Sequence, residues 1–255
     1  SGIVGVALVE PERPLQGRVD VDLVSASAQA AGYAGEVSWL ASVRRSLIDE
    51  VFHLLEQDYG EPSFLDGLLR LQWQSERAAW TWGAFNASDE LTLDDPTAGE
   101  SAKADYHNTM TWLRGEHRLS DAVSTDVTFS YTEVDNEREG TLDDAVDAVG
   151  ALTETREFRV VSGDAGVRWQ PGARWSVHAG AHASWQRGVF DVAMASDFGL
   201  LGAGLQTEPL RRTVQAERDG SLYGVFASVG FEPTDRLHLE AGARYDMQDI
   251  DPVHD

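Results

Sequence analysis

Two groups of charged residues in this sequence have the types and spacing that ligand binding needs. Asp143, Asp144 and Asp147 gather carboxylates that could hold Ca²⁺ or a cationic ligand, but no glycine-spaced calcium loop surrounds them. A solvated loop is therefore the favoured interpretation of this acidic run. Arg44 and Arg45 are adjacent and could hold an anionic ligand. Both groups are weak candidates for ligand-binding residues.

A histidine pair raises the question of a metal site. His178 and His182 lie four positions apart, and in a strand this spacing separates them by about 13 Å, too far for two ligands of one metal. They are better interpreted as polar residues lining a lumen. The sequence has no serine on a nucleophile elbow, no glycine-rich phosphate loop and no zinc motif. We therefore predict no catalytic residue, no metal and no cofactor, and a protein that is not an enzyme.

The composition narrows the choice of partners. The net charge is -23, from 20 Lys and Arg against 43 Asp and Glu, which would repel a phosphate backbone and disfavours nucleic acid as a partner. The mean hydropathy is -0.31, and no run approaches the roughly 18 apolar residues of a spanning helix. A membrane is still possible, because in a transmembrane barrel only alternate strand residues face lipid.

The elements that would position these residues are β-strands. From 236 to 247 every odd position is apolar and nearly every even position is polar, and residues 175–186 repeat the pattern. A helix would spread the same residues around its whole surface. The alternation changes phase at Val160 and Val161, which predicts a β-bulge there.

About eleven strands follow from this alternation. They are predicted at residues 17–25, 27–34, 36–45, 63–74, 78–89, 105–117, 123–134, 154–169, 174–187, 219–232 and 236–248. Short polar links at 74–77, 119–122, 170–173 and 233–235 alternate with long links at about 46–62, 90–104, 135–153 and 188–218. Short turns on one rim and long loops on the other are typical of a transmembrane β-barrel.

Aromatic residues fall near the ends of the predicted strands, where amphipathic rings sit at lipid headgroups. The predicted interface residues are Trp73, Trp80, Trp112, Trp169, Trp175, Trp185, Tyr223, Phe231 and Tyr245. The alternative is that they are core aromatics of a soluble β-sandwich or a stack that binds carbohydrate.

The end of the sequence resembles the barrel wall of TonB-dependent receptors. A strand carrying Tyr223 reaches the short turn 233–235, Leu237 follows, and the returning strand ends in the Gly-x-Arg-Tyr-Asp run at 242–246, in the order of the family's hairpin. Residues 1–11 are similar to the last strand of the family's plug domain. The Arg-Arg-Ser run within residues 39–49 resembles a subset of these receptors.

The resemblance implies an all-β fold. A complete receptor of the family has an antiparallel transmembrane β-barrel of about 22 strands, and about 11 of them would lie in this chain. Residues 1–11 would be the end of the plug and residues 12–255 the N-terminal half of the barrel. We therefore expect a fragment, with the TonB box, the signal peptide and most of the plug before Ser1.

The resemblance also implies a function. The protein would be a receptor in the bacterial outer membrane for the energy-coupled uptake of a scarce nutrient such as a siderophore, cobalamin or a saccharide. Its partners would be outer-membrane lipid, a small nutrient ligand, and an inner-membrane TonB complex contacted through a region outside this chain. Two alternatives remain open: a passive porin or structural barrel, and a soluble extracellular sugar-binding β-protein.

Overall fold

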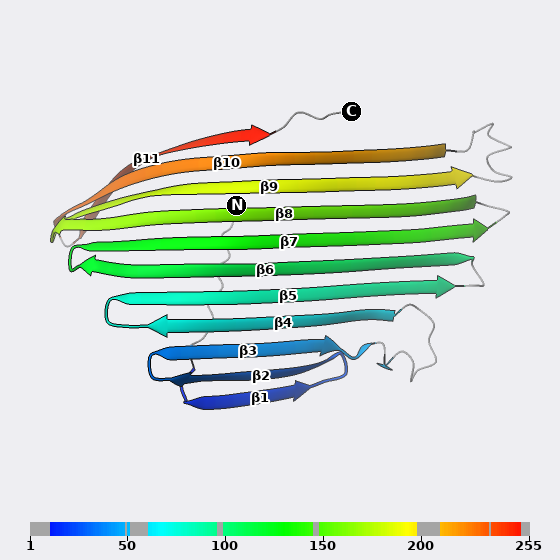
Figure 1. Ribbon diagram of the computed structural model, residues 1–255, viewed down its shortest axis with the longest axis horizontal. Coiled ribbons are helices and arrows are strands. Elements are labelled where there is room, and N and C mark those ends of the chain that lie inside the picture. Colours follow the sequence, from blue (N-terminus) through cyan, green and yellow to red (C-terminus); the bar gives the residue numbers. More distant parts are fainter. Residues whose placement is uncertain are drawn as a thin grey trace.

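The computed structural model describes residues 11–48, 50–51, 61–95, 99–144, 148–197, 210–234 and 236–250. Within these ranges the chain forms one sheet of eleven antiparallel strands, in which each strand pairs with its neighbours in the sequence (Figure 1). The strands are β1 Leu15–Val21, β2 Ser25–Ala34, β3 Val37–Ser46, β4 Glu61–Gln74, β5 Ala78–Asp95, β6 Glu100–Ser120, β7 Val123–Asp144, β8 Ala148–Gly172, β9 Trp175–Asp197, β10 Leu210–Thr234 and β11 Leu237–Ile250. The predicted all-β antiparallel fold of about eleven strands is confirmed.

The alternation of short and long links is weaker than the sequence predicts, because only 96–99 joins β5 to β6 and only 145–147 joins β7 to β8. Tight turns at 35–36, 75–77, 121–122 and 173–174 lie at one end, called the turn rim, on the left of Figure 1, where β10 ends and β11 begins as well. At the opposite end, called the loop rim, lie the short turn 22–24 between β1 and β2 and the ends of β3, β5, β7 and β9. At the turn rim, Gly35 has a φ of 60°, in the left-handed region that favours glycine. The turn between β4 and β5 is closed by a bond of 2.8 Å from the Ser75 amide to the Ala78 carbonyl.

Strands β6 to β10 are longer than predicted, because they continue far into the segments expected to be loops. β10 begins at Leu210 rather than 219, and β8 begins at Ala148 rather than 154. The predicted bulge at Val160 and Val161 is wrong, because the register of β8 with β7 and β9 is unbroken at these residues. The register shift in β8 lies instead between Trp169 and Gly172, beside the turn.

The phase change has another cause. In one direction along β8 from Val161 the residues on one face are glycine, alanine, valine and tryptophan, and in the other direction the same face carries Arg159, Glu157 and Thr155. The strand therefore keeps its register while the surroundings of that face change from apolar to aqueous. Such a change is expected where a strand leaves a bilayer.

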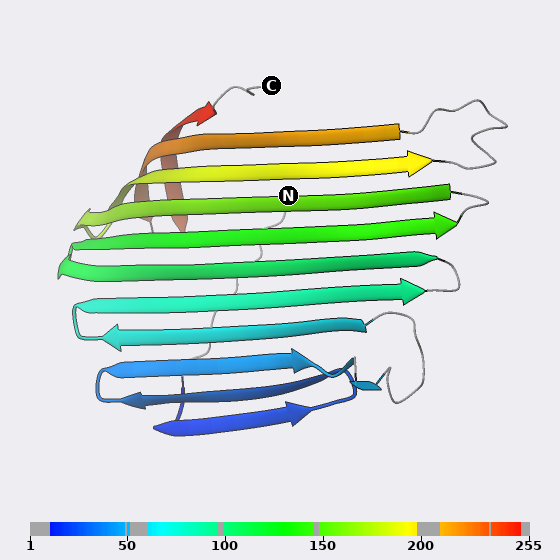
Figure 2. The same ribbon diagram turned by 45° about the vertical axis from the view of Figure 1, so that its right-hand side comes forward.

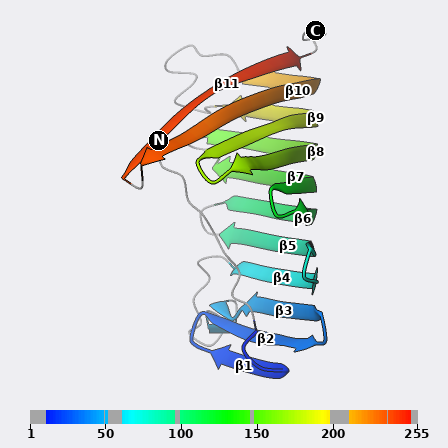
Figure 3. The ribbon, with the colours of Figure 1, turned by 90° about the vertical axis from the view of Figure 1, so that its left-hand side faces the viewer.

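The sheet has no packed interior of its own. Figures 2 and 3 show a single curved layer, with β10 and β11 leaning out of the plane of the middle strands. Among the described residues the buried hydrophobic side chains are only Ala31, Leu40 and Ala87, whereas large apolar residues such as Trp175 and Val225 are about half exposed. A water-soluble sandwich would cover these side chains with a second layer. Within the same residues, no helix has the length and apolar run needed to cross a membrane.

Candidate functional site

One face of the sheet, called here the apolar face, carries aliphatic and aromatic side chains across all the strands. In one row, Val127, Ala165, Ala181, Val225 and Tyr245 pair in turn from β7 to β11. Rows of this kind are what the period-two pattern predicts once neighbouring strands are aligned in register. The opposite face, called the polar face, carries the intervening residues.

The height of the apolar face fits an outer membrane. On β9 it runs from Trp175 to Trp185, ten residues apart. At about 3.3 Å per residue this is roughly 33 Å along the strand, or about 25 Å along the membrane normal at a tilt of about 40°. The apolar band of outer-membrane barrels is about 25 Å tall.

Eight of the nine predicted interface aromatics lie on the apolar face. They are Trp73, Trp80, Trp169, Trp175, Trp185, Tyr223, Phe231 and Tyr245. The ring of Trp175 stacks on that of Phe231 with centroids 4.3 Å apart. Near the turn rim, Trp73 pairs with Trp80 and donates a hydrogen bond of 3.0 Å to Glu36.

The prediction for Trp112 is wrong. This residue pairs with Gly83, whereas its neighbour Leu113 pairs with Trp82, so Leu113 is on the apolar face and Trp112 is on the polar face. The indole ring lies over Gly83, at a position where an added Cβ would collide with it. Trp112 therefore lies on the opposite face of the sheet from the other eight aromatics.

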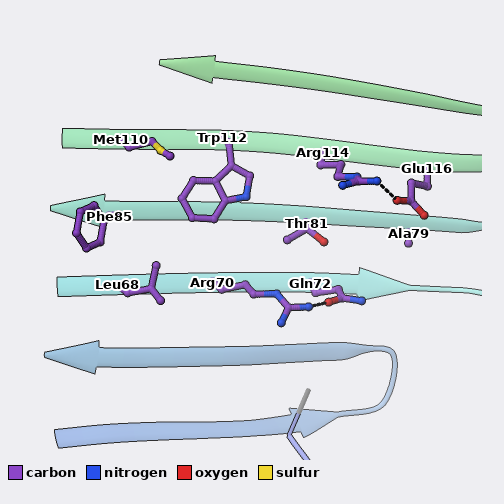
Figure 4. A pocket seen from close by; sticks show the side chains of 10 residues that line it. All are labelled: Leu68, Arg70, Gln72, Ala79, Thr81, Phe85, Met110, Trp112, Arg114 and Glu116. Atoms are coloured by element: carbon purple, nitrogen blue, oxygen red, sulfur yellow. Dashed lines mark hydrogen bonds and ion pairs between the residues drawn. The ribbon is translucent and has the colours of Figure 1, made fainter. Parts of the chain in front are cut away.

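Trp112 helps to form a hollow on the polar face of β4, β5 and β6 (Figure 4), with a volume of about 640 Å³. Two polar pairs lie in this hollow: Arg70 is hydrogen-bonded to Gln72, and Arg114 forms an ion pair of 2.7 Å with Glu116. The other lining residues are Leu68, Ala79, Thr81, Phe85 and Met110. The hollow thus offers apolar surface beside one ion pair and beside Arg70, which is hydrogen-bonded to a neutral amide.

The two predicted arginines are not brought together. Arg44 pairs with Asp66 on the polar face, where its guanidinium also lies 4.8 Å from the ring centroid of Phe64. Arg45 is on the other face and forms an ion pair with Glu50. Because adjacent residues of a strand point to opposite faces of the sheet, the two side chains cannot bind the same ligand.

The predicted acidic cluster lies at the loop rim and is only partly described. Asp143 and Asp144 are the last residues of β7, and Asp147 lies outside the described residues. The Asp143 amide donates a bond of 2.8 Å to the Gly99 carbonyl. Within the described ranges, no group of three or more His, Asp or Glu side chains is arranged to hold a metal ion.

The two histidines are both on the polar face of β9 but have different partners. His182 Nδ1 lies 2.7 Å from Asp164 Oδ1, and His178 packs edge to face on Phe226 with centroids 4.9 Å apart. The structure therefore places each histidine in a separate contact of the polar face.

Toward the loop rim, the side of the sheet that carries the apolar face becomes strongly charged. This side is called outward below. Glu133 accepts hydrogen bonds of 2.9 Å from the Tyr131 hydroxyl and 2.6 Å from Arg159 Nε, which hold the pKa of this carboxyl below its usual value. Beside it, burial and then the charges of Glu133 and Glu157 raise the pKa of Asp135. One oxygen of Asp135 is buried without a hydrogen-bond partner.

Sequence reasoning missed the most buried charge of the polar face. Glu154, with a relative exposure of 6%, is flanked by Arg138 and Arg156. Arg138 falls in a segment expected to be a loop, and the other two lie at the predicted start of a strand. The position in the strand would have indicated them, because residues two positions apart in a strand share a face. All three are even-numbered, like the polar-face residues Ser130 and Ser162.

Comparisons with known proteins bear on the same sheet. Residues 56–254 match the family described as TonB dependent receptor-like, beta-barrel. No curated protein matches the sequence.

Several solved structures share the fold. The ferripyoverdine receptor of the Pseudomonas aeruginosa outer membrane aligns with 96% of this chain at 12% identity and a TM-score of 0.70. The ferric preacinetobactin receptor of Acinetobacter baumannii aligns with 94% at 12% identity and a TM-score of 0.53, and the RagAB peptide importer with 88% at 8% identity and 0.58. The chain spans 39%, 42% and 31% of the lengths of these proteins.

Proposed function

Because the chain belongs to the TonB-dependent receptor-like β-barrel family, we propose that it forms part of the barrel wall of a receptor that captures a scarce nutrient outside the cell and imports it with energy from the inner membrane. Receptors of this family reside in the bacterial outer membrane and are transporters rather than enzymes. What we propose for this chain is that the cargo is a scarce nutrient and that its import uses energy from the inner membrane.

The observation that carries the proposal is the two-faced sheet. Its apolar face is about as tall as an outer membrane's hydrocarbon region, and its polar face is lined with ion pairs and hydrogen-bonded side chains such as Arg114 with Glu116 and His182 with Asp164. A wall of this kind separates lipid from a wet interior. The eight aromatics of the apolar face would lie at the two lipid headgroup layers.

The division of the chain is part of the same proposal. Residues 1–11 would be the end of a plug domain, and residues 12–255 the N-terminal half of the barrel. The inner-membrane TonB complex would act through a region outside this chain. Among the structural relatives, two receptors are named for ferric chelates and one for peptides, which supports either class as cargo here.

Uptake measurements on the full-length receptor test the proposal. A strain that lacks the gene and the complemented strain would be supplied with ferric siderophores, cobalamin, oligosaccharides or peptides at limiting concentration, with and without a protonophore. We expect the receptor to restore uptake of one of these classes only while the membrane is energised. Uptake that persists with the protonophore, together with a steady conductance in planar bilayers, would identify a passive porin instead.

A further inference from the structure

The charge of the sheet is divided between its two faces near the loop rim. Four successive rows of the polar face across β7 to β10 hold four arginines and one glutamate, namely Arg138, Arg156, Arg212, Arg218 and Glu154. The four outward rows that alternate with them hold eight carboxylates and two arginines, namely Glu133, Asp135, Glu137, Glu139, Glu157, Asp191, Glu217, Asp219, Arg159 and Arg187. In a chain of net charge -23, the inner side of this region is therefore basic.

Two of these arginines are held by the one carboxylate. Arg138 Nη1 lies 3.6 Å from Glu154 Oε2, and Arg156 forms an ion pair with the other oxygen of Glu154. The side chain of Glu154 is 8% exposed, whereas those of Arg138 and Arg156 are 43% and 49% exposed. One buried carboxylate thus anchors two guanidinium groups that keep a positive charge in excess and remain open to the solvent.

Aromatic rings support both guanidinium groups from the side. Arg138 lies 5.2 Å from the ring centroid of Tyr106, and Arg156 lies 5.0 Å from that of Phe190. A guanidinium carries five N–H donors, so a single shared carboxylate leaves donors for a further acceptor. Stacking on a ring reduces the freedom of a long side chain, which lowers the entropic cost of binding an anion.

We infer that this basic patch, defined as Arg138, Arg156, Arg212 and Arg218, binds a small anion that carries carboxylate groups. Arg138 and Arg156 supply the direct hydrogen bonds, since guanidinium and carboxylate match in plane and spacing. Arg212 and Arg218, on β10, add positive charge in the first and last of the four rows. Lipid phosphates are not the ligand, because the patch lies on the face opposite to the apolar band.

The inference rests on the proposed function, because it assigns the charge class of the cargo that reaches the inner wall. It predicts an anionic cargo, captured before it passes the lower part of the lumen. Neutral sugars gain little from such a patch.

Calorimetry on the full-length receptor in detergent tests the inference. The probe is trimesate, a flat benzene ring with three carboxylates, and its neutral triamide is the matched control ligand. We expect trimesate to bind and the triamide to bind at least about tenfold more weakly. Each of Arg138→Gln and Arg156→Gln should weaken trimesate binding about tenfold. Arg187→Gln, the same charge change in one of the outward rows of this region, should leave the affinity unchanged.

Folding and function are separated by two further readings. Heat-modifiable gel mobility identifies any variant that fails to form the barrel. Arg138→Lys keeps the positive charge but loses the planar guanidinium that can bind a carboxylate through two parallel hydrogen bonds, so an intermediate affinity is expected. Equal binding of trimesate and triamide, or unchanged affinity in the Arg138→Gln Arg156→Gln double variant, would overturn the inference. Energy-dependent uptake of a neutral cargo alone would leave the proposed function standing and refute the basic patch as its ligand site.

Discussion

An arginine in place of Ala181 should destabilise the full-length receptor by about 2–4 kcal/mol, the range for an arginine on the lipid face near the bilayer midplane. Ala181 lies on the apolar face, six residues from Trp175 and four from Trp185. These intervals are about 20 Å and 13 Å along the strand, which puts the residue near the middle of the apolar band. Its paired neighbours Ala165 and Val225 offer no carboxylate to the new charge.

The next residue provides the matched control. His182→Arg puts the same side chain on the same strand but on the polar face, where Asp164 is already the partner of the histidine at 2.7 Å. This variant should change the free energy of unfolding by less than about 1 kcal/mol. The assay is urea unfolding in phospholipid vesicles, followed by tryptophan fluorescence. If both variants cost the same, or if Ala181→Arg costs nothing, the assignment of the two faces is incorrect.

Three smaller perturbations test local features of the sheet, each by the same unfolding assay. Gly35→Val should cost about 1–2 kcal/mol, because valine must adopt the φ of 60°, whereas Gly67→Ala, whose Cβ meets nothing within 4 Å, should cost nothing. Gly83→Val should cost about 1–3 kcal/mol by displacing the ring of Trp112, and Trp112→Ala in addition should remove most of that penalty. Burial raises the pKa of Asp135, so its charged form weakens the fold at neutral pH and this penalty fades as the pH falls toward about 4. Asp135→Asn should therefore stabilise the receptor at pH 7, with a gain that shrinks on acidification, and an equal gain at both pH values would contradict the assignment.

The sequence was sufficient for the strands inside the bilayer and insufficient beyond it. Between Trp175 and Trp185 one face must be apolar and the other polar. Apolar and polar residues therefore alternate throughout this segment, and the strand can be recognised from the sequence. Beyond Trp185 the apolar residues of β9, such as Val189, Phe190 and Val192, fall on both faces, so the strand continues to Asp197 without the alternation that would reveal it. The loop-rim halves of β6 to β10 were therefore predicted as loops.

The error at Trp112 has a different origin. In the segment 105–117, Tyr106, Met110 and Trp112 form a more apolar set than Thr111 and Leu113, so the sequence favours the wrong face. Only the pairing of Leu113 with Trp82 determines which set faces lipid. A one-residue difference in register exchanges the two faces of a strand, and a single sequence contains no direct record of register.

The division of charge between the two faces changes what the net charge of the chain can predict. A net charge of -23 suggests that an anion would be repelled, and this argument is sound for a nucleic acid approaching the outer surface. A small ligand in the lumen meets the polar face instead. Charges on opposite faces of one sheet are on the order of 10 Å apart, and the Debye length at physiological salt is about 8 Å, so much of the field of the outward carboxylates is screened there. The sign of the charge that the lumen selects is therefore set by Arg138, Arg156 and the two arginines of β10, and an increase in ionic strength should weaken trimesate binding by screening these near charges.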